Sequence, residues 1–283
     1  MNKKSRSRLT ITLRQDILPQ LDCIIDGEKI RNRSHAIEYI LSQYLGPKIC
    51  NALILAGGEG VKMRPFTYEM PKSMIPVKGR PILQHVIEMI RGSGITDLYI
   101  IIDQKLGQKI TEYFGNGSKF GVTITYLKEP ANAGTAGALR TAKDKIKETF
   151  LLYYSDVLAD IELRELMHFH KEVTPVLSAA LTAADNPSDY GVVKLKGNKI
   201  VDFVEKPTQP DYLGLVSAGI FIAEPEIFNY LPEHTPSSLE KDVLPRLAKQ
   251  SKLSGYPFSG KWYDISTPEV YERVLKEWLN KKV

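Results

Sequence analysis

The sequence predicts an α/β protein with a doubly wound sheet, preceded by a small separate domain. From residue 51 onward, short strands that are apolar along their whole length alternate with segments of helical periodicity. This alternation is typical of a parallel sheet covered by helices on both faces. A glycine-rich turn follows the first of these strands, whereas the first 45 residues read as one strand followed by two helices. We therefore expect two domains, residues 1–47 and residues 48–283.

Composition limits the class of protein. The chain has 283 residues, of which 43% are hydrophobic and 25% charged, enough for one or two domains with a core. No apolar run reaches the roughly 18–20 residues that span a bilayer, and the N-terminus lacks the apolar segment of a signal peptide. The only cysteines, Cys23 and Cys50, have neither a metal-binding nor a redox spacing. We therefore expect a cytoplasmic protein with no membrane partner and with free thiols.

Positive charge is concentrated at the N-terminus. Residues 1–48 contain nine Lys/Arg and five Asp/Glu, and the whole chain has a net charge of +5. A basic first domain on a nearly neutral second one favours an anionic partner for the first. A solvated basic tail is the alternative.

The second domain begins with a regular series of elements. Strands are expected at residues 52–57, 97–103, 122–127 and 149–156, and helices at residues 81–94 and 136–147. Pro81 suits the first position of its helix, and glycines end it. In a sheet of this kind, ligands bind beyond the carboxyl ends of the strands. The glycine-rich turn lies at that edge.

The glycine-rich turn stands in the stretch ALILAGGEGVKMRPF, residues 52–66. Gly57, Gly58 and Gly60 let the backbone turn sharply and approach a ligand, and successive amides in such a turn bind anions. The spacing matches neither the Walker motif nor the dinucleotide-binding fingerprint. The stretch MPKSMIPVKGRP, residues 70–81, adds Lys72 a short distance downstream. Together they predict a phosphate-binding site.

The stretch from Leu55 to Leu83 resembles the signature of sugar-1-phosphate nucleotidyltransferases, the nucleoside-diphosphate-sugar pyrophosphorylases. The resemblance covers about residues 51–280, and five further segments match in order: EPANAGTAGAL, YYSDV, DYGVVKLKGNKIVDFVEKP, SAGIFIAEPEIF and KWYDISTPEVY. It implies a Rossmann-like nucleotidyltransferase domain with a mixed, mainly parallel sheet. It also implies transfer of a nucleotidyl group from an NTP to a sugar-1-phosphate, which yields a nucleotide-sugar and pyrophosphate.

The resemblance assigns nucleotide binding to the end of the first strand, its turn and a later loop: Leu55, Ala56, Gly57, Gly58, Gly60, Glu129, Gly134 and Thr135. A carboxylate at Glu129 suits adjacent N–H donors such as those of guanine. Both a mannose-1-phosphate guanylyltransferase and a glucose-1-phosphate thymidylyl- or uridylyltransferase fit the pattern, so the base and the sugar stay open.

The remaining roles concern phosphates, sugar and metal. By resemblance the catalytic cations are Lys62, Arg64 and Lys72, and the sugar phosphate is bound by Gly191, Glu205 and Lys206. Asp156 and Asp264 would hold Mg²⁺, which prefers carboxylate oxygens. Both reactants are anions, so the site must neutralise their repulsion and align them for in-line attack.

One position departs from the family. Gly60-Val61-Lys62 stands where the family usually has Gly-Thr-Arg. Lysine keeps the charge but loses the two-pronged hydrogen bonding of arginine. The alternative to an enzyme is therefore a transcription regulator whose catalytically weakened body senses a nucleotide or a nucleotide-sugar.

The first domain cannot bury its apolar faces alone. Leu9, Ile11 and Leu13 alternate with polar residues, a helix with apolar residues between 17 and 25 follows, and Ser34 is a good N-cap for a second helix. A segment this short needs a partner copy. We therefore expect a homodimer or a higher even-numbered oligomer.

Residues 7–45 resemble ribbon-helix-helix repressors, in which strands from two copies pair into a ribbon that enters the DNA major groove. The resemblance implies that double-stranded DNA is a partner, with bases facing Arg8, Thr10 and Thr12. Phosphates would be held by Arg31, Arg33 and the amides at Ser34. The alternative is a dimerisation module that never touches DNA.

Overall fold

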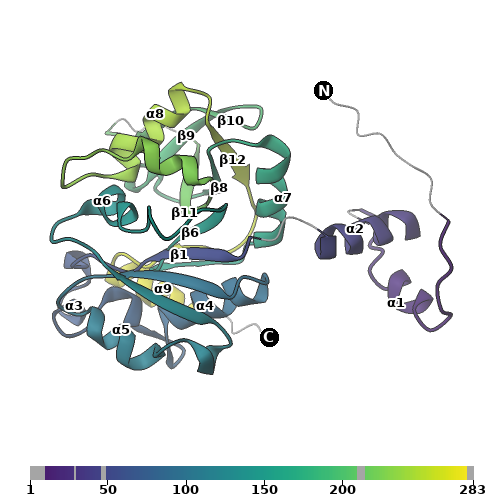
Figure 1. Cartoon of the computed structure of the whole chain (residues 1–283), viewed down its shortest axis with the longest axis horizontal. Helices are drawn as coiled ribbons and strands as arrows, with labels where there is room; N and C mark the ends of the chain where they lie inside the picture. The colour runs from purple at the N-terminus through teal and green to yellow at the C-terminus, as the bar shows by residue number, and fades with distance from the viewer. Residues whose placement is uncertain (1–9, 29, 46–48, 209–213, 279–283) are drawn as a thin grey trace. The chain divides into compact units, whose positions relative to one another are not determined.

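The computed structural model of the chain describes residues 10–28, 30–45, 49–208 and 214–278. It divides into two compact units, Met1–Lys48 and Ile49–Val283, which we call the head and the body. Figure 1 shows the elements of each unit.

The body is built on one nine-stranded sheet, in the order β5-β4-β1-β6-β11-β8-β12-β10-β9. β1 pairs in parallel with β4 and β6, and β4 with β5, whereas β11 runs antiparallel to β6 and β8. The sheet is therefore mixed, as the resemblance implies, but it is not mainly parallel: β12 runs parallel to β8, whereas β10 runs antiparallel to both β12 and β9. The strands are β1 Asn51–Leu55, β4 Asp97–Ile102, β5 Thr123–Lys128, β6 Phe150–Tyr154, β8 Leu177–Ala183, β9 Gly191–Lys196, β10 Lys199–Glu205, β11 Leu215–Ala223 and β12 Leu253–Pro257.

Both faces of this sheet are buried. Leu53 of β1 lies in one apolar cluster and its neighbour Ile54 lies in the other. Ile100 and Ile101 of β4 divide in the same way. Successive side chains of a strand point to opposite faces, so burial on both sides explains why these strands are apolar throughout.

Helices cover the two faces of the sheet (Figure 1). The α-helices are α3 Phe66–Glu69, α4 Ile82–Gly92, α5 Gly107–Phe114, α6 Gly134–Arg140, α7 Leu163–Val173, α8 Leu244–Lys249 and α9 Pro268–Glu277. The expected helix at residues 136–147 is shorter than predicted. The amides of Thr141, Ala142 and Lys143 bond to carbonyls three residues back, so the chain tightens into turns after α6.

Shorter elements connect these. The 3₁₀ helices are η1 Val61–Met63, η2 Lys72–Met74, η3 Ser118–Phe120, η4 Pro187–Asp189 and η5 Pro225–Tyr230, and η6 Leu239–Val243 is a π-helix. β2 Pro76–Val77 pairs with β3 Arg80–Pro81, and β7 Val157–Ala159 pairs with β13 Trp262–Asp264. The second of these pairs positions part of the site.

The head contains two helices, α1 Leu18–Asp22 and α2 Arg33–Leu45, around a core of Leu21, Ile30 and Ala36. Residues 10–14, expected in a strand, have no regular secondary structure in the single chain. Ser34 is not the N-cap as predicted, because α2 begins at Arg33 and the side chain of Asn32 accepts the His35 amide at 2.9 Å. Arg8 and Leu9 lie outside the described residues.

Within the described ranges, no helix combines the length and the apolar character needed to cross a membrane. Cys23 and Cys50 are exposed free thiols. The cytoplasmic location stays a prediction.

Candidate active site

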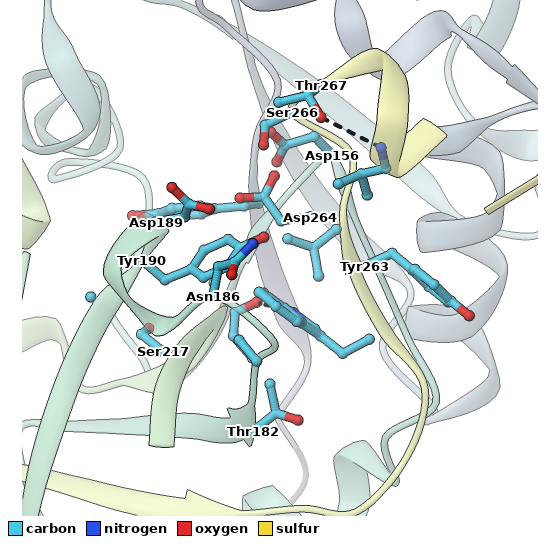
Figure 2. A pocket seen from close by; sticks show the side chains of 18 of the residues that line it. Asp156, Thr182, Asn186, Asp189, Tyr190, Ser217, Tyr263, Asp264, Ser266 and Thr267 are labelled. Atoms are coloured by element: carbon cyan, nitrogen blue, oxygen red, sulfur yellow. Dashed lines mark hydrogen bonds between the residues drawn. The ribbon is translucent and has the colours of Figure 1, made fainter. Parts of the chain in front are cut away.

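A cavity of about 1040 Å³ opens in the body where several chain segments converge. Residues after β1, at the ends of β6, β8 and β10, and at the start of β9 line it, together with β13 and the first turns of α9. Figure 2 shows the cavity, with Asp156 and Asp264 near Ser266 and with Asn186, Asp189 and Tyr190 beside them. The site residues predicted in the body that line this cavity are Gly60, Lys62, Lys72, Asp156, Gly191, Glu205, Lys206 and Asp264.

Strand pairing brings Asp156 and Asp264 together. Asp156 directly precedes β7, and Asp264 ends β13, where it pairs with Val157. The amide of Ile265 donates to the carbonyl of Asp156 at 2.9 Å. Two carboxylates that are far apart in the sequence therefore share one end of the cavity.

The charges at this end favour a cation. The Lys72 ammonium forms an ion pair with the Asp156 carboxylate. Burial and the neighbouring Asp156 charge raise the pKa of Asp264 to about 7. Oδ1 of Asp264 is buried and has no hydrogen-bond partner among the described residues. A divalent metal ion would satisfy this oxygen and the like-charged pair, so the predicted Mg²⁺ ligands fit the group.

The glycine turn is left-handed at two positions, with φ of 91° at Gly58 and 58° at Gly60. The amide of Gly58 donates to Oε1 of Glu129 at 3.1 Å, so the Glu129 carboxylate lies against the turn. Burial raises the pKa of Glu129, and this amide partly opposes the rise. Leu55, Ala56, Gly57, Gly58 and Glu129 do not line the main cavity, although Gly60 does.

Two of the predicted catalytic cations, Lys62 in η1 and Arg64 directly after η1, have their side chains in different surroundings. Lys62 is exposed and lines the cavity. Arg64 does not line it, because its guanidinium lies 3.6 Å from the Glu59 carboxylate and 5.0 Å from the centre of the Tyr68 ring. Only Lys62 of this pair therefore faces the space where phosphates would bind.

The predicted sugar-phosphate residues also line this cavity. Nζ of Lys206 lies 3.7 Å from Oε1 of Glu205 at the end of β10. A Cβ on Gly191 would lie 2.3 Å from the Phe203 ring and 3.1 Å from Oε2 of Glu205, so only glycine fits without displacing them. Burial, followed by the nearby charge of Glu240, raises the pKa of Glu205.

The loop that contains Gly134 and Thr135, predicted to bind the nucleotide and called the base loop below, lies against η6. Gly134 and Thr135 begin α6, and the Thr135 hydroxyl donates to Oε2 of Glu240 at 2.8 Å. The same hydroxyl accepts the Leu239 amide at 2.8 Å. The Thr135 side chain is therefore used within the protein, and neither residue lines the main cavity.

Several polar residues of the cavity were not predicted. The nearest sequence signal is the polar run DNPSDY immediately before Gly191, at the end of β8. Arg273 of α9 binds Asp185 of this run at 2.9 Å. Glu240 had no signal, because its segment reads as an ordinary helix start. The unpredicted residues include Tyr154, Thr182, Asp185, Asn186, Asp189, Tyr190, Ser217, Glu240, Trp262 and Arg273.

The predicted DNA-binding residues of the head are only partly available. Thr10, Thr12 and Arg31 are exposed. Arg33 is engaged in a two-pronged ion pair, with its Nε and Nη2 each 2.7 Å from an oxygen of Asp22. Its predicted contact with phosphate would require breaking this pair.

Known proteins match the body. A mannose-1-phosphate guanyltransferase of Candida albicans is 33% identical over 224 residues, covering 77% of this chain and 61% of that protein. Probable mannose-1-phosphate guanylyltransferase 2 of Oryza sativa subsp. japonica is 34% identical over 236 residues, covering 81% of this chain and 64% of that protein. The chain thus spans less than two thirds of the length of these relatives.

Solved structures share the fold. UDP-glucose pyrophosphorylase complexed with UDP-glucose superposes with a TM-score of 0.72 at 25% identity, covering 82% of this chain and 98% of that one. A Bacillus anthracis protein assigned as a glucose-1-phosphate thymidylyltransferase gives a TM-score of 0.75 at 25% identity, covering 81% and 94%. The family profile described as Nucleotidyl transferase matches residues 51–281. By sequence, fold and the residues around its cavity, this chain belongs to the nucleotidyl transferase family.

Proposed function

We propose that the body transfers a nucleotidyl group from an NTP to a sugar-1-phosphate. The observation that carries the proposal is one cavity that gathers two chemically distinct sets of residues. Lys72, Asp156 and Asp264 form the first set, and Glu205 with Lys206 forms the second. The first set suits a triphosphate and the second suits a sugar phosphate.

In the proposed reaction, a phosphate oxygen of the sugar-1-phosphate forms a bond to the α-phosphorus of the NTP. The bond from that phosphorus to its bridging oxygen breaks, and pyrophosphate leaves. Lys62 and Lys72 offset the negative charge of the phosphate oxygens, and Lys206 holds the sugar phosphate for in-line attack. The Glu205 carboxylate accepts hydrogen bonds from sugar hydroxyls.

Asp156 and Asp264 would hold the metal, for which the unpartnered oxygen of Asp264 is the structural support. Mg²⁺ held there supplies positive charge to the phosphate oxygens. Near-isosteric Asp156→Asn and Asp264→Asn variants should each lower turnover by at least about a hundredfold, since several kcal/mol of charge stabilisation is lost. A rise of the melting temperature on addition of Mg²⁺ should occur in the native protein and disappear in both variants.

For the substrates we propose GTP and mannose-1-phosphate. The mannose-1-phosphate guanylyltransferases among the relatives support this pair. Glu129 adds chemical support, because one of its oxygens binds Gly58 and the other remains for the N–H donors of a guanine edge. The structural neighbours favour glucose-1-phosphate with UTP or dTTP as the competing pair.

The experiment is a product screen with purified protein. Five nucleoside triphosphates are each combined with mannose-1-phosphate and glucose-1-phosphate in the presence of Mg²⁺, and pyrophosphate release is measured. GTP with mannose-1-phosphate should be the best pair. The Glu129→Gln variant should lower the preference for GTP over UTP by about tenfold, as expected when one hydrogen bond to a charged group is lost.

A second candidate function is nucleotide sensing by a transcription regulator, favoured by the lysine at position 62. Binding of GTP or of a nucleotide-sugar without turnover of any pair in the screen would support it. Turnover by the native protein would establish the enzyme, whatever the head does.

For the head we propose pairing with a second copy and binding of double-stranded DNA. A groove of about 380 Å³ in the head is lined mainly by apolar side chains, including Ile11, Leu13 and Ile37. Ile11, Ile40 and Leu41 are each more than two-fifths exposed. Residues 10–14 would form a ribbon only when a second copy supplies the hydrogen bonds that a lone strand lacks.

A further inference from the structure

Glu240 lies where three segments of the body meet. It belongs to the π-helix η6, a rare form that is frequent at functional sites. Its side chain lines the main cavity, half-buried. None of the chemistry described above uses it.

Three hydroxyl groups donate to this one carboxylate. Tyr154, at the end of β6, donates to Oε1. Thr135 and Ser238 donate to Oε2 at 2.8 and 2.7 Å. Burial raises the pKa of the Tyr154 phenol well above the ordinary value, so the phenol stays protonated and donates its hydrogen bond. Donors from distant parts of the chain thus converge on a single anion.

One of these links reaches the base loop. Beyond the Thr135 hydroxyl, the amide of Ala136 donates to the carbonyl of Ser237 at 3.0 Å, and the amide of Ser237 donates to the carbonyl of Ala133 at 3.0 Å. A Cβ on Gly134 would lie 2.3 Å from that Ser237 carbonyl. The loop and the segment before η6 are therefore fastened tightly together.

Glu240 also shares the cavity with the residues predicted to bind the sugar phosphate. Glu240 and Glu205 line the same cavity, and their charges act on one another. Thr135 does not line that cavity. The bond to Thr135 and the cavity shared with Glu205 place Glu240 between the base loop and the residues predicted to bind the sugar phosphate.

We infer that Glu240 is a positioning residue that couples the base loop to the sugar pocket through its bonds to Thr135 and Tyr154. This inference rests on the proposed transferase function and deepens it. When a bound nucleotide holds the base loop, the bond from Thr135 fixes the Glu240 carboxylate. The position of Glu205 in the same cavity is then fixed as well. Binding of the nucleotide should therefore favour binding of the sugar-1-phosphate, and the reverse must also hold.

The test is a kinetic double-mutant cycle with Mg²⁺, GTP and mannose-1-phosphate, or the best pair from the screen. Thr135→Val removes the hydroxyl and keeps the shape. It should raise the KM for the sugar-1-phosphate by about fivefold or more, a typical coupling, although Thr135 lies outside the sugar pocket. Glu240→Gln should raise both KM values. Thr135→Val added to Glu240→Gln should have little further effect on the sugar-1-phosphate KM.

Thr141→Val is the matched control. The Thr141 hydroxyl also ends a turn of the α6 region, where it donates to the Ala138 carbonyl at 2.7 Å without contacting Glu240. This variant should leave both KM values unchanged. Melting temperatures of all variants show whether any effect is merely a loss of folding, and kcat at saturation separates positioning from chemistry.

Two results would overturn the inference. One is a Thr135→Val variant that changes only the KM for the NTP, and the other is strict additivity in the cycle. If the native protein turns over no pair, the proposed function fails separately. Coupling is then measured by calorimetry as the ratio of GTP affinities with and without mannose-1-phosphate, which Thr135→Val should reduce. Absence of any coupling in the native protein would overturn the inference there too.

Discussion

At the scale of single residues, the two lysines at the phosphate end are held differently. Lys72 is mostly buried and paired with Asp156, so its ammonium is fixed in place. Although burial opposes its charge, the carboxylates of Asp156 and Asp264 raise the pKa of Lys72. Lys62 is exposed and has room for a larger side chain. Substitutions at the two positions should therefore differ in their effects.

Lys62→Arg should preserve or raise kcat, because the guanidinium adds a second hydrogen bond to the same phosphate oxygens. Lys62→Ala should lower kcat by about tenfold to a hundredfold, the effect of a lost charge-assisted bond of roughly 1.5–3 kcal/mol. Steady-state kinetics under saturating substrates measures both. Since the side chain is exposed, neither variant should change the melting temperature. An arginine variant slower than the native protein would show that the site is built for lysine.

The residues of the site that were predicted from sequence share one property. Each lies in a short local motif: Lys72 follows the glycine-rich turn, and Asp156 and Glu205 were assigned by resemblance to motifs of the family. Glu240 has no such pattern, because its role depends on Tyr154 and Thr135, which are distant in the chain. Arg64 shows the reverse error. Its position was predicted, but the side chain turns toward Glu59 and Tyr68, and such a choice depends on local packing.

At the scale of elements, two glycines stand close to side chains that are predicted to bind the substrates. A Cβ on Gly57 would lie 2.3 Å from Oε1 of Glu129, and a Cβ on Gly191 would lie 2.3 Å from the Phe203 ring. Neither glycine has a positive φ, so alanine would suit the backbone and act only through these contacts. The two substitutions are therefore controls for one another.

Gly57→Ala should raise the KM for the NTP and leave that for the sugar-1-phosphate, since it displaces only Glu129. Gly191→Ala should do the opposite, because it pushes on Phe203 and Glu205. Each change should be about tenfold, as expected for one disturbed hydrogen bond of about 1.4 kcal/mol. Initial rates over a grid of both substrates give both constants. Equal changes in both KM values for either variant would contradict the separate roles proposed for Glu129 and Glu205.

A polar cluster between α7 and β8 predicts a pH dependence of stability. His170 is 3% exposed, and its ring nitrogens lie 2.8 Å from the Ser178 hydroxyl and 3.0 Å from a Glu224 oxygen. Burial lowers the pKa of His170, and Glu224 opposes this only in part. Burial also lowers the pKa of His85. The unfolded chain therefore binds protons at a higher pH than the folded one.

The two histidines should consequently lower the melting temperature as the pH drops below about 6.5, the ordinary histidine value, whereas Asp264, whose pKa is raised to about 7, acts in the opposite direction. His170→Gln should reduce the slope between about pH 6.5 and 5. Differential scanning fluorimetry at several pH values measures the slope, and a slope that His170→Gln does not alter would remove this histidine as its cause.

The elements that could be predicted are those whose pattern is local. The four parallel strands β1, β4, β5 and β6 and the helix α4 follow from apolar runs and from proline and glycine signals. The pairing of the other strands could not be predicted from such signals, because it is decided between segments that are distant in the chain. The start of α2 was misplaced by two residues since Asn32 and Ser34 are both good caps.

At the scale of the whole molecule, the body has its own extensive core, whereas few side chains are buried among the described residues of the head. We expect a unit of this size with exposed apolar residues to be stabilised by association. Light scattering should therefore show a dimer or a higher even-numbered oligomer for the full chain. A truncated chain that begins at Ile49 should lose this association and keep its turnover. A full-length monomer at micromolar concentration would contradict the ribbon-helix-helix proposal.

Neighbouring residues of the head separate pairing from DNA binding. Ile11 is 44% exposed and lines the apolar groove, so Ile11→Asp should abolish both the dimer and any DNA affinity. Thr10→Asp should keep the dimer and abolish DNA binding, because its charge would face the DNA in the proposed ribbon. Arg31→Ala should weaken binding to all sequences and flatten the salt dependence by about one unit. The effect of Arg33→Ala would be harder to assign to DNA binding alone, because the substitution also removes the ion-pair partner of Asp22.

The measurement is an anisotropy titration against random and genomic DNA at two salt concentrations, with turnover assayed in parallel. Because Ile11 and Thr10 lie in the head, both variants should keep the native kcat if the body works alone. A dimer without DNA affinity even at low salt would make the head an oligomerisation device, and the regulator proposal would fall with it. DNA affinity that changes on addition of a nucleotide-sugar would instead join the two functions, because a ligand bound in the cavity would then alter the head.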